Sequence, residues 1–343
     1  MDIAGKNISE KTFVIAEAGS NHNGSFETAK KLIDVAVDAG ADAVKFQTFR
    51  ADKLYVENIG EEGYFGNNKS IYDTMEAMEM PYDWIPELRD YCEDSDIVFM
   101  STPFDERSAD KLEDFVPAYK IASYTMSHHP FLRYIAGKNK PIIMSTGTHE
   151  LDEVRESVEV LRDAGADDIV LLHCVASYPT PLGAANVRAV KTLRDTFNLQ
   201  SGLSDHTLDP VTAPSAAVAL GAGVVEKHFT LDKSMDGPDH EFALEPDELN
   251  EMVDTIRRTE QALGDGTVKV LNVEEELHEI ARRRIHAACD IEEGEVISEE
   301  DVKILRSGKR KRGAEPKFYE EIIGKKTKNY IREGEGVSLE DVR

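Results

Sequence analysis

Short apolar runs rich in β-branched residues alternate with amphipathic helical stretches from Thr12 to Gly264, and this alternation limits the possible folds more than any other feature. A strand followed by a helix, repeated along a chain, is typical of a parallel sheet covered by helices. Eight such units in about 250 residues favour a (β/α)8 TIM barrel, an α/β fold, over an open doubly wound sheet. The predicted strands are Thr12–Glu17, Ala43–Gln47, Ile97–Met100, Ala118–Ser123, Pro141–Ser145, Ile169–Cys174, Gln200–Leu203 and Val224–Lys227.

The segments between these strands carry apolar residues at helical spacing. The predicted helices include Ser25–Ala39, Leu151–Ala164 and Asp209–Leu220, and His128-His129 is predicted to begin another. One connection is much longer, because Phe49–Pro81 follows the second strand without a regular pattern. The segments after barrel strands lie on the catalytic face, so we expect this insertion to overhang the mouth of the site.

A short repeat marks a second, smaller domain after the barrel. Asp290–Val302 (DIEEGEVISEEDV) and Tyr330–Val342 (YIREGEGVSLEDV) share Ile, a Gly-Glu pair, Ser and Glu-Asp-Val at a 40-residue offset. We therefore predict a barrel domain at 1–265, a linker at 266–281 and a small β-rich module at 282–343 whose halves are related by pseudo-symmetry. The module carries a dense basic run, Arg306 to Arg312.

The charge of the chain excludes several classes of partner. Forty Lys and Arg stand against 66 Asp and Glu, which gives a net charge of −26 at pH 7. Such a protein repels polyanions, so we expect neither nucleic acid nor an anionic membrane as a partner. The sequence has no secretory signal, no membrane-spanning apolar run and only three scattered cysteines, which together predict a cytoplasmic location. The sequence contains no P-loop and no GxGxxG motif after a predicted strand. It therefore gives no support for binding of ATP or NAD.

Polar residues gather at the predicted C-terminal ends of the strands, where barrel enzymes carry out their chemistry. Lys45 and Lys120 lie in otherwise apolar strands, where an unpaired charge is costly, so together they predict a site for phosphate or carboxylate. The alternative is that these lysines reach the rim of the barrel or pair with Glu17. Hydroxyl groups that can donate to the same anion belong to Thr102, Ser123, Ser145 and Ser204.

Two histidines predict an open metal site. His206 and His228 end adjacent strands, so their imidazoles can converge on one divalent cation, with water and a substrate oxygen completing the shell. The alternative is that each histidine only forms hydrogen bonds or orients a substrate. Asp205, next to His206, is a candidate for orienting that ring. We assign no metal to His22 or to His128-His129.

At this point the motifs resemble those of a known family. In chain order they are EAGSNHNG (Glu17–Gly24), VKFQT (Val44–Thr48), STPF, YKIAS (Tyr119–Ser123), STG, YPTP, GLSDHT (Gly202–Thr207), EKHFT and GPDH (Gly237–His240). Together they resemble the sialic acid synthase family, whose members condense phosphoenolpyruvate with N-acetylmannosamine or a related amino sugar. The resemblance covers nearly the whole chain, and the terminal module looks like the antifreeze-like (SAF) domain of that family.

The resemblance also implies roles for individual residues. It implies that phosphoenolpyruvate is held by Lys45, Gln47, Thr102, Lys120, Ser123, Ser145 and Ser204. It implies a divalent metal, manganese or magnesium, on His206 and His228, and sugar contacts from Glu17, Tyr178 and Asp239. Arg306 lies where the family's terminal domain reaches the sugar of the neighbouring subunit, which implies a domain-swapped homodimer.

Two departures from the family pattern concern the sugar. The family often has a carboxylate two residues after the serine of the YKIAS motif, where this chain has Thr125. The usual Arg-Pro-Gly of the terminal loop here is Arg306-Ser307-Gly308. Neither change touches the residues expected to hold phosphoenolpyruvate, so we expect any difference to lie in the sugar.

The hypothesis from the sequence is a sialic acid synthase reaction, in which C3 of phosphoenolpyruvate attacks the aldehyde of an open-chain N-acetylated mannosamine-type sugar. Water captures C2, phosphate leaves, and Glu17 orients the water or manages its proton. A synthase of legionaminic or pseudaminic acid type is the nearest alternative. An aldolase that forms a Schiff base through Lys120 and a non-catalytic carbohydrate-binding protein are the others.

Overall fold

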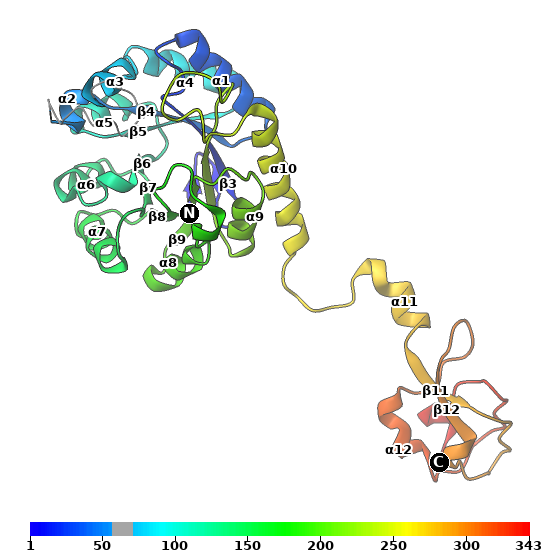
Figure 1. The fold of residues 1–343 in the computed structure, drawn as a ribbon. Coiled ribbons are helices and arrows are strands. Elements are labelled where there is room, and N and C mark those ends of the chain that lie inside the picture. Colours follow the sequence, from blue (N-terminus) through cyan, green and yellow to red (C-terminus); the bar gives the residue numbers. More distant parts are fainter. Residues whose placement is uncertain (57–70) are drawn as a thin grey trace. The chain divides into compact units, whose positions relative to one another are not determined.

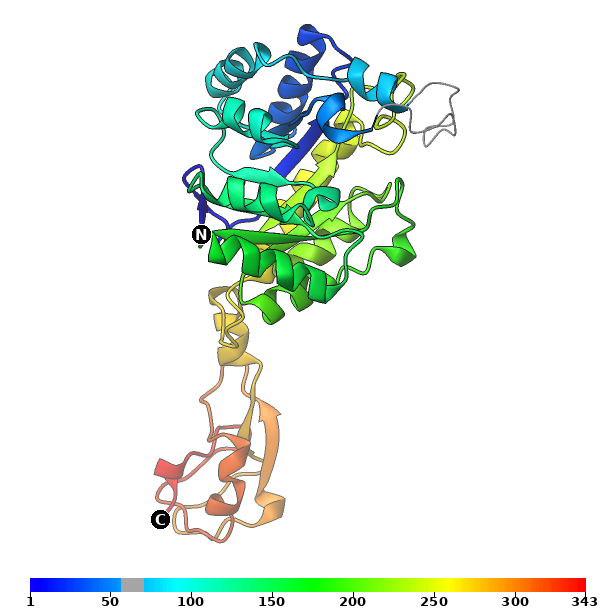
Figure 2. The same ribbon diagram turned by 90° about the vertical axis from the view of Figure 1, so that its left-hand side faces the viewer.

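The computed structural model describes residues 1–56 and 71–343, which form two compact units, Met1–Gly264 and Asp265–Arg343. Figures 1 and 2 show helices around the outside of the strands in the first unit. The predicted linker, 266–281, falls in the second unit and contains the short helix α11 (Glu275–Ile280).

The first unit is the predicted barrel. Its eight parallel strands follow one another in space in the order β5-β4-β3-β10-β9-β8-β7-β6, and the end strands β5 and β6 also lie next to each other. The predicted (β/α)8 class is therefore confirmed. The strands are β3 (Phe13–Gly19), β4 (Ala43–Thr48), β5 (Val98–Pro103), β6 (Tyr119–Ile121), β7 (Ile142–Ser145), β8 (Ile169–Cys174), β9 (Gln200–Asp205) and β10 (Val224–His228).

In the described residues, eight helices cover the barrel strands, and a hairpin, β1 (Asp2–Ile3) and β2 (Lys6–Asn7), precedes them. The predicted helix at Asp209 begins later, because the Asp209 carboxylate accepts hydrogen bonds from the N–H groups of Val211 and Thr212 and so precedes the helix. His128 caps the helix that the sequence places there. The helices are α1 (Phe26–Asp38), α4 (Trp84–Asp94), α5 (Glu106–Leu112), α6 (His129–Ala136), α7 (Leu151–Asp163), α8 (Ala189–Phe197), α9 (Thr212–Ala219) and α10 (Pro246–Leu263).

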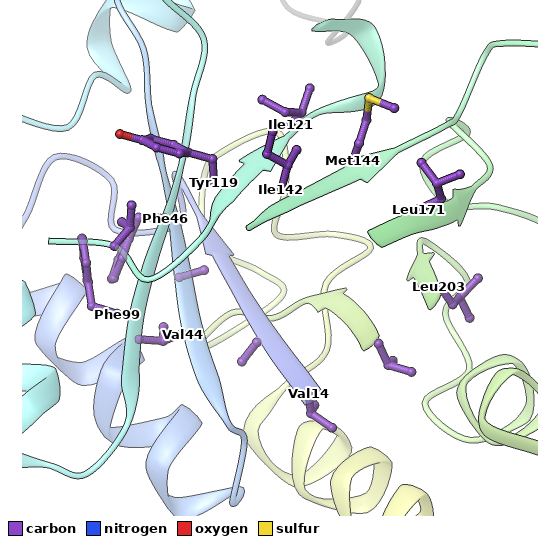
Figure 3. Packing of buried hydrophobic residues seen from close by; sticks show 14 of the residues in the cluster. Val14, Val44, Phe46, Phe99, Tyr119, Ile121, Ile142, Met144, Leu171 and Leu203 are labelled. Carbon is purple, nitrogen blue, oxygen red and sulfur yellow. The ribbon is translucent and has the colours of Figure 1, made fainter. Parts of the chain in front are cut away.

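Two apolar layers hold the barrel together. The outer layer lies between the strands and the helices; Figure 3 shows part of it, where Val44, Phe46 and Phe99 pack side by side on β4 and β5. The inner layer fills the end of the barrel at which the strands begin, where Ile3 of the hairpin packs with Phe13 and other strand residues. Of the helices in the described ranges, none is long and apolar enough to cross a membrane.

Only part of the predicted insertion at Phe49–Pro81 belongs to the described residues. It contains two short helices, α2 (Ala51–Leu54) and α3 (Ile71–Ala77), which pack through a small cluster of Phe49, Ala51 and Met75. The rest of the insertion, 57–70, lies outside the described residues. Its predicted position over the mouth of the barrel therefore stays a prediction.

The second unit contains the repeat. Strands β11 (Arg283–Ala287) and β12 (Val302–Arg306) pair antiparallel, and the short helix α12 (Tyr319–Ile322) follows. Equivalent residues of the two repeats, Ile291 and Ile331, pair with each other, and each repeat ends in the same type of capped 3-10 turn, closed by Ser298 with Asp301 and by Ser338 with Asp341. The pairing agrees with the predicted pseudo-symmetry.

Candidate active site

The inner face of the barrel changes from apolar to polar along each strand. On β4, Ala43 belongs to the inner apolar layer, and Lys45 follows two residues later on the same face. On β10, Val224 is followed in the same way by Glu226 and His228. All eight strands run in the same direction, so these polar side chains gather at one end of the barrel.

Two lysines and two carboxylates form a buried cluster at this end, which we call the charge cluster (Glu17, Lys45, Lys120, Glu226). Lys45 Nζ lies 2.6 Å from Glu17 Oε2 and 3.6 Å from Glu226 Oε2. Lys120 Nζ lies 3.6 Å from the other oxygen of the Glu226 carboxylate. Glu17, Lys45 and Lys120 are each 2% exposed and Glu226 is 5% exposed. Charges buried this deeply are tolerated because opposite signs compensate each other.

Burial and neighbouring charges move the pKa values of the charge cluster in different directions. Burial raises the pKa of Glu17 to about 7, although the Lys45 ammonium opposes it. Burial acts in the same sense on Glu226, but the two lysines outweigh it and hold the pKa of that carboxyl below its usual range. Burial lowers the pKa of Lys120, whereas the two carboxylates more than offset burial at Lys45 and raise its pKa. Glu17 is therefore the carboxyl of this cluster suited to exchange a proton near neutral pH.

Three of the four predicted hydroxyl groups bond directly to the charge cluster. Lys45 donates to Thr102 Oγ1 at 2.9 Å, and Lys120 donates to Ser145 Oγ at 2.7 Å. Ser204 donates to Glu226 Oε1 at 3.1 Å. The hydroxyls thus line the surroundings of both lysines, as the sequence predicts.

Ser123 and Gln47 complete this side of the pocket. Ser123 Oγ accepts a hydrogen bond from the Gly147 N–H at 3.0 Å. An added Cβ at Gly147 would lie 2.9 Å from Ser123 Oγ and 3.1 Å from Cys174 Sγ, so the backbone can approach this closely only as glycine. Gln47 donates to Glu17 Oε1 at 3.0 Å and so belongs to the same pocket.

The two predicted metal ligands lie together on the neighbouring strand ends. The ring centroids of His206 and His228 are 5.5 Å apart. The ring of Tyr178 lies 4.2 Å from that of His206, and the ring of Phe242 lies 5.1 Å from that of His228. Asp239 Oδ2 is 3.9 Å from His228 Nδ1, and burial raises the pKa of Asp239 to about 6. This side of the pocket therefore combines two imidazoles, two aromatic rings and one carboxylate.

The two histidines fit an open metal site. Burial and nearby positive charges hold the pKa of His228 well below its usual range, so its ring is neutral, which is the form that binds metal. Its Nδ1 is buried without a hydrogen-bond partner among the described residues. His206 Nδ1 lies 2.9 Å from the Val175 carbonyl, which leaves Nε2 as its ligand atom. Within 1–56 and 71–343, no group of three His, Cys, Asp or Glu could hold a metal ion, so water and substrate would have to complete the shell.

Comparison with known proteins supports what the geometry indicates. The NeuB family matches residues 32–268, and the SAF domain matches residues 282–343. The first match alone covers more than half of the chain. The chain belongs to the NeuB family.

Several known proteins match this chain along almost its whole length. It is 42% identical over 329 residues to the N,N'-diacetyllegionaminic acid synthase of Campylobacter jejuni serotype O:2, covering 94% of this chain and 97% of that protein. It is 38% identical over 350 residues to the pseudaminic acid synthase of C. jejuni serotype O:23/36, covering 100% of both. The crystal structure of the spore coat polysaccharide biosynthesis protein SpsE of Bacillus subtilis is 40% identical and covers 100% of this chain and 99% of that one, with a TM-score of 0.68.

Two residues of this NeuB pocket were missed by the sequence analysis. The carboxylate of Glu226 contacts both Lys45 and Lys120. One sign of this position was available in the sequence, because Glu226 precedes His228 by two residues and so lies on the same face of β10. Cys174 Sγ lies 3.8 Å from His206 Nδ1. The available signal was that Cys174 follows the inner-layer residue Leu172 by two residues and so lies on the same face of β8. Burial alone would raise the pKa of the Cys174 thiol, but the contact with His206 outweighs burial and lowers it.

The structure corrects one predicted contact. The Asp205 carboxylate binds Lys227 and the N–H and hydroxyl of Thr207 rather than orienting the His206 ring. Neighbouring residues of a strand face opposite sides of the sheet, so Asp205 points away from the face that carries Ser204. Lys227 is buried on that outer side, and the pair of opposite charges makes its burial tolerable.

The structure does not test the predicted roles of two further residues, Thr125 and Arg306. Thr125 is buried in the 3-10 turn after β6, two residues beyond Ser123. Arg306 lies in the second unit at the end of β12, where its side chain is exposed. The sugar contacts predicted for both residues stay predictions.

Proposed function

We propose that this NeuB family member is a transferase that joins phosphoenolpyruvate to an N-acetylated amino sugar with release of phosphate. The observation that carries the proposal is the pair of buried lysines, Lys45 and Lys120, ringed by hydroxyl groups and adjoining the pair His206 and His228. Two convergent ammonium groups in a buried pocket suit a small ligand with both a phosphate and a carboxylate. The names of the relatives as synthases of nonulosonic acids support the same class of reaction.

Binding of this anion would change the charge balance of the pocket. With all four groups ionised, the charge cluster is neutral, and phosphoenolpyruvate adds two to three negative charges. Lys45 would then exchange its contact with Glu17 for one with the substrate, and Lys120 would remain anchored by Ser145.

The proposed bond formation follows from this arrangement. The electron pair of the C2–C3 double bond forms the new bond from C3 to the aldehyde carbon of the open-chain sugar, and the aldehyde oxygen takes up a proton from solvent water. Water adds to the electron-deficient C2, and ionised Glu17 accepts its proton. The bond between C2 and the phosphate oxygen then breaks while the proton of the new C2 hydroxyl passes to the departing phosphate, which leaves a 2-keto acid. Lys45 and Lys120 hold the phosphate and carboxylate throughout.

We also propose manganese or magnesium as a cofactor held by His206 and His228. When bound, the metal would polarise the aldehyde oxygen as a Lewis acid. The support is the neutral His228 ring with a buried, unbonded Nδ1. Chelation should abolish turnover, and His206→Ala and His228→Ala should each reduce the metal content measured in the purified protein. Full turnover by the chelated protein would contradict the assignment.

N-acetylmannosamine is the first candidate for the acceptor sugar. A sugar precursor of legionaminic or pseudaminic acid is the second candidate. The second candidate is favoured by Thr125, which replaces a carboxylate of the family pattern, and by the names of the two relatives. An assay of phosphate release with N-acetylmannosamine and with diacetamido hexoses distinguishes them, with the product identified by mass spectrometry. Release that needs phosphoenolpyruvate but no sugar would contradict the proposal.

Two other functions give different outcomes in simple experiments. A Schiff-base aldolase would use Lys120, whose pKa is lowered by burial. Borohydride in the presence of a keto acid would then add the mass of the reduced adduct to the protein. A carbohydrate-binding protein would bind sugar without releasing phosphate. The condensing enzyme should show phosphate release and no borohydride adduct.

We further propose that the protein acts in the cytoplasm as a domain-swapped homodimer, in which Arg306 of each chain contacts the sugar in the barrel of its partner. Arg306 is exposed and has no ion-pair partner in the described part of the chain. Two later residues of the basic run differ, because Lys311 pairs with Asp341 and Arg312 pairs with Glu279 in the same unit, whereas Lys309 and Arg310 resemble Arg306 in forming no ion pair within the described residues. Arg306 is thus available for an anionic or polar ligand.

A further inference from the structure

A buried histidine closes the loop that follows β10 onto the barrel. His240 is 0% exposed, and both of its ring nitrogens have partners. Nδ1 lies 2.6 Å from Thr230 Oγ1, just after β10, and Nε2 lies 3.2 Å from Asn23 Oδ1, in the loop between β3 and α1. Because β3 and β10 are adjacent strands, the ring joins two neighbouring loops at the same end of the barrel. We call Thr230, His240 and Asn23 the His240 clasp.

The direction of the hydrogen bonds in the clasp is fixed by Asn23. Its Nδ2 donates to the carbonyl of Asp236 at 2.9 Å, so its Oδ1 is the acceptor and His240 Nε2 must be the donor. Burial lowers the pKa of His240, and Nδ1 of the neutral ring accepts a hydrogen bond from the Thr230 hydroxyl. The chain of bonds therefore starts at the end of β10, crosses to the loop after β3 and returns to the β10 loop at Asp236.

The clasp also fixes the backbone immediately before the candidate sugar contact. Gly237 has a φ of 151°, and a Cβ added there would lie 2.6 Å from His240 Cδ2, so the chain passes directly against the ring. Asp239 follows two residues later, with Oδ2 3.9 Å from His228 Nδ1. The same oxygen is 3.4 Å from where a Cβ on Gly19 would lie, at the end of β3.

We propose that His240 is a positioning residue for Asp239, and that through Asp239 it determines how well the enzyme recognises its sugar. The clasp ties loop 231–239 to the loop after β3 and so sets the distance between the Asp239 carboxylate and the histidine pair. The residues proposed to hold phosphoenolpyruvate lie on strands, apart from Ser123 in the 3-10 turn after β6, and the two lysines among them are anchored without the clasp. The inference rests on the proposed function, because Asp239 contacts the sugar only in that proposal.

Steady-state kinetics of clasp variants test the inference. His240→Ala should raise the KM for sugar and lower kcat/KM for sugar by about tenfold or more, because small misplacements of a positioning group are costly. The KM for phosphoenolpyruvate should stay unchanged. His240→Gln keeps a donor that can reach Asn23 and should recover part of the loss. Ser234→Ala, an exposed residue of the same loop that bonds only to Asp232, is the matched control and should behave as the wild type.

Hydrogen exchange followed by mass spectrometry gives a readout that does not need activity. The N–H groups of Lys233, Ser234 and Met235 are bonded to Glu245 and Asp232, so the wild-type loop should be protected. In His240→Ala, exchange should accelerate about tenfold or more in 231–239 and remain unchanged in α7. His240→Gln, which keeps a donor toward Asn23, should show the same change to a smaller extent and serves if His240→Ala does not fold.

The possible outcomes separate the inference from the proposed function. If the wild type releases no phosphate with any sugar, the proposed function is wrong, and faster exchange in the variant would still support the positioning role of His240 in the loop. If the clasp variants keep wild-type exchange and wild-type kinetics, the positioning role is wrong. If the KM values for sugar and phosphoenolpyruvate rise by the same factor, His240 only supports the whole barrel and the inference fails.

Discussion

Replacement of Glu226 by glutamine removes one charge from the charge cluster and leaves the shape of the side chain nearly unchanged. Each lysine then loses a carboxylate 3.6 Å away. At an effective dielectric constant of about 20, each of these attractions is worth roughly 5 kcal/mol, and the cost of burying the carboxylate offsets much of the sum. Removing one partner of a buried ion pair commonly costs about 3–5 kcal/mol, so we expect the free energy of unfolding of the barrel to fall by that amount.

The same substitution should change how an anion affects stability. Phosphoenolpyruvate can supply the missing negative charge, so it should stabilise Glu226→Gln more than it stabilises the wild type. Urea unfolding with and without saturating phosphoenolpyruvate measures both effects, and Trp84, the single tryptophan of the chain, reports on the barrel through α4.

An exposed ion pair supplies the matched control. Glu93 pairs with Arg89 at 2.8 Å on the surface of α4, and Glu93→Gln should change the free energy of unfolding by at most about 1 kcal/mol, with no dependence on phosphoenolpyruvate. The reasoning would be refuted if Glu226→Gln were as stable as the wild type, or if phosphoenolpyruvate stabilised both proteins equally.

The remaining predictions concern the substrates and the assembly. Lys120→Ala should weaken binding of phosphoenolpyruvate, measured by calorimetric titration, far more than binding of sugar; an unchanged titration would show that the lysine does not face the anion. Because the pKa of Glu17 is about 7, above its ordinary value of 4.5, the ionised base is lost as pH falls, so kcat/KM should decrease below about pH 7, and a profile flat to pH 5 would contradict the role of Glu17. For the same reason this carboxyl contributes stability that is present below pH 4.5 and is lost as the pH rises through about 7. Thr125→Glu should change the ranking of accepted sugars, and an equal factor for every sugar would show that the position does not discriminate. Mixing inactive Arg306→Ala and His206→Ala dimers should restore roughly a quarter of wild-type activity, because half of the dimers become hybrids with one complete site; no recovery after confirmed chain exchange would contradict the shared site.

Much of the barrel could be predicted because strands and helices leave local patterns in the sequence. The predicted strand Ile169–Cys174 has the observed bounds, and the other seven agree within a few residues. The helix predicted from Asp209 begins instead at Thr212, since the Asp209 carboxylate accepts hydrogen bonds from the N–H groups of Val211 and Thr212 in the turn before the helix, and periodicity does not show such a turn.

The candidate site could be predicted only in part, because its contacts depend on closure of the barrel. The lysines stood out as charges in apolar strands, and the alternative that Lys45 pairs with Glu17 is confirmed as a contact of the charge cluster. Glu226 was missed because it lies on β10, whereas Lys45 lies on β4 and Lys120 on β6. The three side chains come into contact only when the sheet closes into a barrel. No local spacing along the chain shows that arrangement.

The most direct test of the proposed reaction uses phosphoenolpyruvate labelled with ¹⁸O in the oxygen that joins C2 to phosphorus. The wild-type enzyme, the label and an accepted N-acetylated sugar are incubated together, and both products are analysed by mass spectrometry. Attack of water on C2 predicts that the label leaves with phosphate and that a 2-keto acid with the summed carbon skeleton of both substrates forms. Phosphate without the label, or pyruvate in place of the condensed acid, would contradict the mechanism assigned to Glu17, Lys45 and Lys120.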